Sequence, residues 1–142
     1  MALVKRGVQV HSTQCSACIS GLESTDHLFL RCPFAVDLWN RLWNWCGITP
    51  MIFSSIKEML NYIATTGQCP KRRTTLLSII CGALWGMWRA RIDRIFNSKL
   101  NSPELVFEGV RALVHAWIKH RHRKGNFVWG NGLNLLSTLC NL

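Results

Sequence analysis

Acidic residues are scarce in this sequence, which holds 7 Asp and Glu against 17 Lys and Arg among 142 residues. Only Asp93, Glu104 and Glu108 follow residue 70. Nuclease or polymerase chemistry requires several carboxylates that converge on divalent cations, and Glu104 and Glu108 are better explained as residues of a helix start. A thiol nucleophile at Cys69 or Cys81 with His115 as its base is weakly supported, because Cys81 would lie on an apolar helix face and no residue is marked out to orient the base. We therefore expect a protein that is not an enzyme.

Long apolar runs are missing as well. The longest, residues 76–88, is too short to span a bilayer as a helix, so it predicts a buried helix and no transmembrane segment. The first ten residues hold Lys5, Arg6 and Gly7 where a secretory signal requires an apolar core. An odd number of cysteines, 7, then favours a reducing intracellular compartment, nuclear or cytoplasmic. In such a compartment, closely spaced cysteines indicate metal or redox chemistry.

Four candidate metal ligands fall within eighteen residues, and these are Cys15, Cys18, His27 and Cys32. Two cysteines separated by two residues can point inward from one tight turn, while a histidine and a third cysteine close a tetrahedron. Three thiolates and a neutral imidazole give a zinc site of net charge about −1 with no open position for water, which predicts a structural role. Backbone donors at a helix start would favour the Cys32 thiolate. His11 in place of His27, and Cys46 as a distant fourth ligand, stay open as alternatives.

Helical spacing of apolar residues predicts helices after this cluster. The first starts at Pro33, because proline suits the first helical position, and ends at Gly47. The second starts at residue 54 or 55, where Ser55 and Glu58 fit a capping box, and runs to Gly67. Residues 7–21 predict a short strand or hairpin that leads into the cysteines.

The third and longest predicted helix covers residues 73–97, after a linker at residues 68–70. Its apolar stripe is expected to be buried and consists of Leu77, Ile80, Cys81, Leu84, Trp85, Trp88, Ile92, Ile95 and Phe96. Ser102 as N-cap and Pro103 at the first position start the fourth helix, which ends in the basic residues 119–124. The predicted fold class is mainly α, with a small N-terminal zinc-binding hairpin or knuckle followed by about four helices.

Further residues around the ligands form a recognisable string: Leu3, Lys5-Arg6-Gly7, Glu23-Ser24, Leu28-Phe29 and Trp39, in addition to the four ligands. Over roughly residues 3–46, this string resembles the zinc-binding domain that follows the reverse transcriptase in plant LINE-type, non-LTR retrotransposon polyproteins. The resemblance implies that Cys15, Cys18, His27 and Cys32 are zinc ligands and that the parent protein handles nucleic acid during element copying. The polymerase region with its metal-binding aspartates is missing, so a truncated or stand-alone fragment is expected.

This interpretation divides the chain into a reverse-transcriptase-type zinc-binding module (1–47), a basic helical extension (48–124) and a C-terminal tail (125–142). Residues 1–70 carry five Lys or Arg against four Asp or Glu, whereas residues 71–142 carry twelve against three. Such asymmetry predicts a polyanionic partner, which is RNA or DNA bound mostly without sequence specificity or, alternatively, an acidic membrane surface. The candidate nucleic-acid-binding residues are Lys71, Arg72, Arg73, Arg89, Arg91, Arg94, Lys119, Arg121, Arg123 and Lys124, with Trp129 as a nearby stacking surface.

Two other functions stay open. Tryptophan-rich helix faces, such as that of Trp39 and Trp43, would suit a protein-interaction module that docks a reverse transcriptase region or another protein; packing of these two rings against the third helix is the favoured interpretation. Alternatively, the chain is a remnant of a retrotransposon and has no selected function. Each basic cluster is also explained by a solvated helix end.

Overall fold

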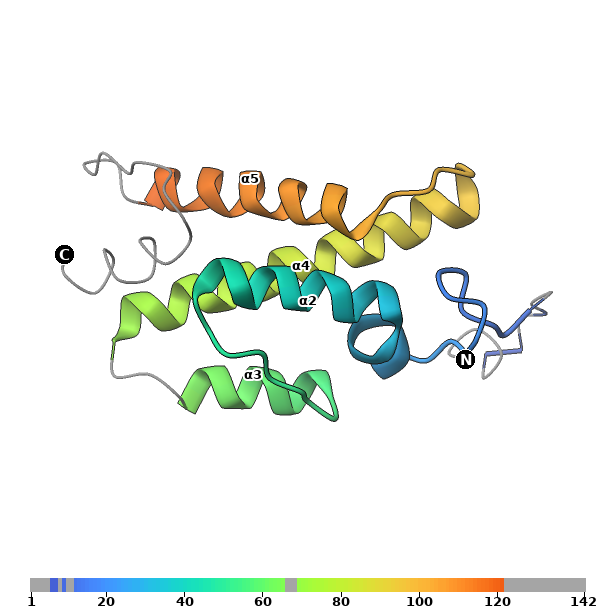
Figure 1. Ribbon diagram of the computed structural model, residues 1–142, viewed down its shortest axis with the longest axis horizontal. Coiled ribbons are helices and arrows are strands. Elements are labelled where there is room, and N and C mark those ends of the chain that lie inside the picture. The colour runs from blue at the N-terminus through green and yellow to red at the C-terminus, as the bar shows by residue number, and fades with distance from the viewer. Residues whose placement is uncertain (1–5, 8, 10–11, 66–68, 122–142) are drawn as a thin grey trace.

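The computed structural model describes residues 6–7, 9, 12–65 and 69–121, with the side chain of Arg121 left out. The helices of this part of the chain are η1 (His27–Arg31), α2 (Pro33–Cys46), α3 (Ile56–Thr65), α4 (Pro70–Phe96) and α5 (Pro103–Arg121) (Figure 1). Gln14 and Leu22 form an isolated antiparallel bridge, and the described residues contain no longer strand. The predicted fold class is therefore confirmed: the chain is mainly α, with the Cys and His cluster before four α-helices.

Both ends of α2 follow from local sequence, as predicted. Pro33 occupies the first turn after Cys32, whose ψ of 135° is extended. Gly47 closes the helix in the left-handed region, with φ at 63°, and its N–H donates to the carbonyls of Asn44 and Trp43. Trp39 and Trp43 lie in the core with their rings stacked, at a centroid distance of 5.4 Å. Both rings are thus buried in the core as expected, and their packing against the third helix stays a prediction.

Helix α3 starts one residue after its predicted cap. The Ser55 hydroxyl accepts the N–H of Glu58 at 3.1 Å, which is half of a capping box. The carboxylate of Glu58 returns to the preceding residue, because it accepts from both the N–H and the hydroxyl of Ser54. These two bonds to Ser54 lower the pKa of Glu58. The predicted helix end at Gly67 lies outside the described residues.

Helix α4 differs from its prediction in where it starts and in which face it buries. It begins at Pro70, so Cys69 and Pro70 are the N-cap and first position and not a linker. Of the predicted apolar stripe only Ile80 is buried, whereas Trp85, Trp88 and Cys81 are exposed. The face that α4 turns to the core consists of Thr75, Leu76, Ile79, Ile80, Gly82, Ala83, Met87 and Ala90.

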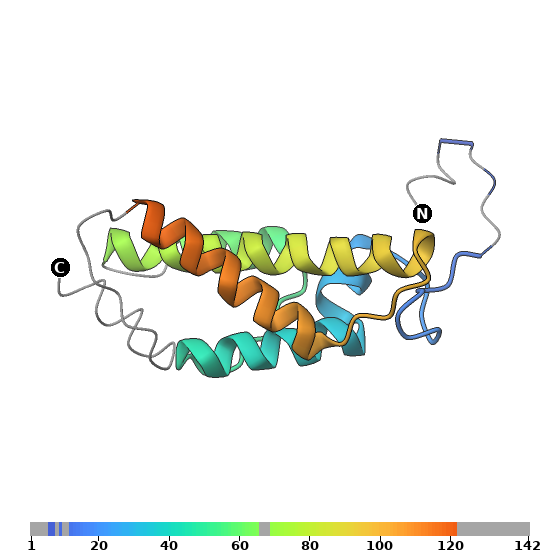
Figure 2. The ribbon, with the colours of Figure 1, turned by 90° about the horizontal axis from the view of Figure 1, so that it is seen from above.

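Small residues explain this choice of face. A Cβ added at Gly86 would lie 2.9 Å from Cγ1 of Val106, and one added at Gly82 would lie 3.4 Å from Cγ1 of Val110. Helix α5 therefore approaches the backbone of α4 closely, and it crosses α4 obliquely (Figure 2). Because bulky side chains would hold the helices apart, Gly82 and Gly86 lie at the interface, whereas Trp85 and Trp88 are exposed.

The buried residues form one hydrophobic cluster that runs from Cys15 and Cys32 through α2 and α3 to Ile118 on α5. The core therefore includes residues on both sides of the predicted boundary at residue 47, and the division into modules stays a prediction. None of the helices in the described segments is both long and apolar enough to cross a membrane. The predicted tail at residues 125–142 lies outside the described residues.

Candidate zinc site

A short hairpin positions the first two cysteines. The N–H of Cys15 donates to the carbonyl of Gly21 at 2.8 Å, and the N–H of Glu23 donates to the carbonyl of Thr13 at 2.8 Å. Inside the loop, the N–H of Ile19 donates to the carbonyl of Cys15 at 2.9 Å, which closes a turn around the second cysteine, Cys18. The hairpin thus encloses the cysteines, whereas the sequence predicted that it leads into them. The predicted strand residues Val8 and Val10 lie outside the described residues.

A wide helical turn positions His27 and Cys32. They bracket the π-helix η1, in which the N–H of Cys32 donates to the carbonyl of His27 at 2.7 Å. A bond between residues five apart brings both to one side of the turn. Ser24 fixes the start of the turn, because its hydroxyl accepts the N–H of His27 at 3.1 Å. The turn is tied to α2 by the indole N–H of Trp39, which donates to the carbonyl of Phe29 at 2.7 Å.

These two elements bring four ligand atoms together. The Sγ atoms of Cys15, Cys18 and Cys32 and a ring nitrogen of His27 all lie within 4.8 Å of one another. Cys15 Sγ and Cys32 Sγ are 3.8 Å apart, and Cys18 Sγ is 3.2 Å from His27 Nε2. A tetrahedral ion with metal–sulfur bonds of about 2.3 Å requires sulfur–sulfur edges of about 3.8 Å. The separation of Cys15 and Cys32 therefore fits such an ion, while Cys18 and His27 lie slightly closer together than its edges.

The surroundings differ among the thiols. Cys15 and Cys32 are 1% exposed, and Cys18 is half-buried. A hydrogen bond with Ser20, followed by smaller contributions that include His27, lowers the pKa of Cys18 to about 6. Burial raises the pKa of Cys32 to about 12. The backbone hydrogen bond from Phe34 lowers this pKa, as predicted for donors at a helix start, but the loss of hydration outweighs it. A bound divalent cation would favour the Cys32 thiolate.

Residues 1–39 match the family model described as zinc-binding in reverse transcriptase. The match confirms the resemblance to a reverse-transcriptase zinc-binding domain. It covers 39 of the 142 residues and includes all four clustered ligands. Comparison with curated proteins and with solved structures finds no match. The matched residues are called the zinc-binding segment below.

An ion pair joins the zinc-binding segment to α4. Arg91 donates from Nε to one carboxylate oxygen of Glu23 at 3.0 Å and from Nη2 to the other. The two side chains are only 23% and 20% exposed, so the pair is largely shielded from water. No local pattern in the sequence predicts this contact, because 68 residues separate its partners. The ion pair with Glu23 also places Arg91, a candidate for phosphate binding, in a structural contact.

The other candidate residues occupy several environments. Arg94 is partly buried, with its guanidinium over the Phe34 ring, and Arg73 is partly buried at the start of α4. Exposed candidates are Lys71, Arg72, Arg89 and Lys119. Arg121 ends α5, and Arg123, Lys124 and Trp129 lie outside the described residues, as does the alternative ligand His11. Cys46, the other alternative ligand, is buried at the end of α2 and is not part of the ligand cluster.

Proposed function

We propose that Cys15, Cys18, His27 and Cys32 hold one structural zinc ion in a segment derived from a LINE-type reverse transcriptase polyprotein. The single observation that supports this most is the convergence of four ligand atoms within 4.8 Å. Three thiolates and one imidazole suit Zn²⁺, and four protein ligands fill its tetrahedral shell. A filled shell leaves no position for a substrate or a reactive water. We therefore propose a structural role for the site and no catalysis.

The proposed role of the ion is to stabilise the hairpin. Two backbone hydrogen bonds join the two arms of the hairpin, from Cys15 to Gly21 and from Glu23 to Thr13, and an isolated hairpin of this size is marginal in water. Structural zinc sites contribute roughly 10 kcal/mol or more to folding of the peptide that holds them. That contribution is large enough to order the hairpin and to orient the ligands on η1.

Elemental analysis of the purified full chain tests the zinc proposal, with one zinc per chain expected. A double variant, Cys15→Ser and Cys32→Ser, should lose the metal because two of four ligands are removed. Cys81→Ser is the matched control, since Cys81 is exposed on α4 and outside the cluster. A double variant that purifies with a full equivalent of zinc would contradict the proposal.

We further propose that the helical part binds RNA or DNA, mainly through phosphates. The formal charge of +10 supports this, as do the exposed Lys71, Arg72 and Lys119. Cations that neutralise phosphates release counterions, so affinity should fall steeply as salt rises. Titration of a labelled single strand and a duplex at several salt concentrations measures that dependence. Charge reversal of Arg121, Arg123 and Lys124 should weaken binding, and absence of binding at low salt would contradict the proposal.

A further inference from the structure

The tryptophans of α4 and α5 are unusually exposed. Trp85, Trp88 and Trp117 expose 52%, 43% and 36% of their surfaces, whereas the three tryptophans of α2 are buried. The rings of Trp85 and Trp88 contact each other, with centroids 5.3 Å apart and planes tilted by 32°. Exposed apolar side chains that gather in this way mark a binding surface, since scattered single residues do not form a patch.

A groove continues this surface along α4. It has a volume of about 570 Å³, lies between the first half of α4 and the end of α5, and is lined by Thr74, Leu77, Ser78, Cys81, Trp117 and His120. Cys81 precedes Trp85 by four residues, which places both on one face of the helix. The groove and the indole pair therefore lie along the same side of α4, and we call them together the tryptophan face.

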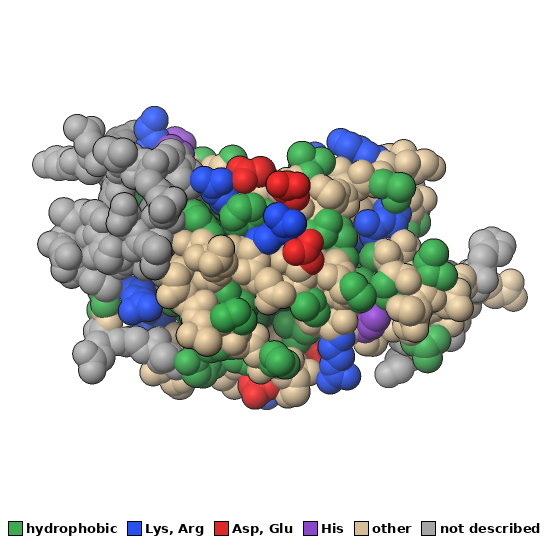
Figure 3. Space-filling model, viewed as in Figure 1, with side chains coloured by type: hydrophobic (Ala, Val, Ile, Leu, Met, Phe, Trp, Pro, Cys, Tyr) green, Lys and Arg blue, Asp and Glu red, His purple; other side chains and the backbone are tan. Residues whose placement is uncertain are grey.

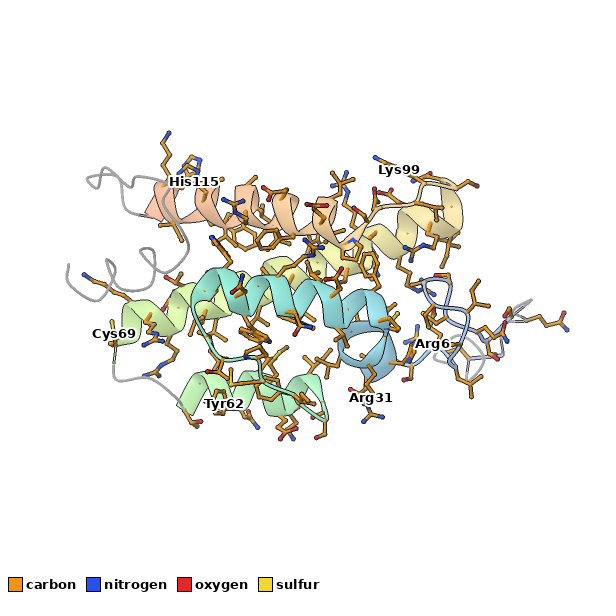
Figure 4. The ribbon with its side chains drawn as sticks, in the orientation of Figure 1. Arg6, Arg31, Tyr62, Cys69, Lys99 and His115 are labelled. Atoms are coloured by element: carbon orange, nitrogen blue, oxygen red, sulfur yellow. The ribbon has the colours of Figure 1, made fainter. Side chains whose placement is uncertain are left out.

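The charged residues near the groove end of the tryptophan face are basic. The sequence holds no acidic residue between Glu58 and Asp93, and none after Glu108. Figure 4 shows that Cys69, at the start of α4, and His115, in the second half of α5, lie at the same end of the bundle. Lys71 and Lys119 are therefore at that end, and on the face drawn in Figure 3 the described C-terminal end of α5 carries blue and purple side chains, with most acidic ones nearer the middle. A polyanion fits this arrangement.

We propose that the tryptophan face binds single-stranded nucleic acid, with bases stacked on Trp117, Trp85 and Trp88. The exposed cations Lys71, Lys119 and Arg89 then face the phosphates. This inference rests on the nucleic-acid binding proposed above and adds a location and a strand preference. Bases of a single strand offer free π faces to aromatic side chains, whereas duplex bases are already stacked on one another. A protein docked on the same rings would require acidic groups of its own to match the surrounding cations.

Fluorescence anisotropy with a labelled oligothymidylate and a mixed-sequence duplex tests the location in the full chain. Trp117→Ala and the double variant Trp85→Ala, Trp88→Ala should each weaken single-strand binding by roughly 5- to 100-fold, because a stacked base is lost. Duplex binding should change little. Trp117→Phe keeps a ring and should retain most of the affinity, which separates stacking from a general change in folding.

Leu105→Ala and Lys57→Glu serve as matched controls. Leu105 is exposed on α5 but away from the groove lining, and Lys57 is an exposed cation on α3. Lys71→Glu should weaken binding, whereas Lys57→Glu should not. If the parent binds both nucleic acids in a salt-dependent way but the tryptophan variants keep full single-strand affinity, the tryptophan face is excluded and phosphate binding still holds. If the parent binds neither nucleic acid at low salt, the proposed function itself fails.

Discussion

Gly21 lies directly against the imidazole of His27. A Cβ at this position would be 2.6 Å from Cε1 and 3.0 Å from Nδ1 of the ring. We expect Gly21→Ala to displace the imidazole and to weaken metal binding about 10-fold or more, since loss of a residue that orients a ligand has effects of that size. Competition with a chromophoric zinc chelator measures the affinity.

The control for this change is Gly109→Ala. Gly109 lies within α5, and a Cβ there would meet nothing within 4 Å. Alanine has a higher helix propensity than glycine, so this variant should gain up to about 1 kcal/mol in stability and keep the parent's zinc affinity. Equal zinc affinities for Gly21→Ala and Gly109→Ala would show that the ring of His27 is not held where the structure places it.

Cys46 is buried at the end of α2, and burial raises its pKa to about 12 from an ordinary value of 9.0. At pH values between 9.0 and about 12, the Cys46 thiol keeps its proton in the folded chain and loses it in the unfolded chain. The contribution of the Cys46 thiol to the free energy of unfolding should therefore be fully present below about pH 9. Above that pH it should fall by about 1 kcal/mol per pH unit. Urea unfolding with reductant present, at several alkaline pH values, should show a shallower decline for Cys46→Ala than for the parent. Parallel declines would contradict the assignment.

At the scale of the element, local signals predicted α2 and α5 well. Pro33 and Gly47 act through their own backbone geometry, and Ser102 caps α5 by accepting the N–H of Leu105 at 3.2 Å. No local signal of this kind predicts the π-turn of η1. Its hydrogen bonds between residues five apart depend on the contacts of the turn with Trp39 and the hairpin. The choice of face on α4 was also beyond local sequence. Apolar residues occur all round this helix, and the close approach of α5 decides which of them are buried.

The close approach of α4 and α5 gives a test at this scale. Gly86→Ala would place a Cβ 2.9 Å from Val106 and 3.2 Å from Val110. Since both neighbours are branched and buried, we expect the helices to separate and stability to fall by about 1–3 kcal/mol. Gly82→Ala is the matched change one turn earlier, where the nearest atom is at 3.4 Å. It should be neutral or slightly stabilising, as urea unfolding of both variants would show.

For the whole molecule, the sequence predicted which four ligand residues come together but not how the zinc-binding segment joins the bundle. Ligand spacing is a local property, and the cluster in the structure is the predicted one. The contact between Glu23 and Arg91 joins residues 68 apart and depends on the packed position of α4. A bidentate arginine–carboxylate pair holds two groups in a fixed geometry. Order in the hairpin and order in α4 should therefore stabilise each other.

Replacing Arg91 measures this coupling. The backbone N–H of Glu23 also donates to the carbonyl of Thr13 in the hairpin. Metal binding that orders the hairpin should therefore fix the position of the Glu23 carboxylate for its contact with Arg91. In Arg91→Gln, the gain in thermal stability on adding zinc should be smaller than in the parent, because the carboxylate loses its charged partner. Arg111→Gln removes an ion pair with Glu108 within α5 and should leave that gain unchanged. Equal zinc-dependent gains in all three proteins would mean that the hairpin and the bundle fold independently.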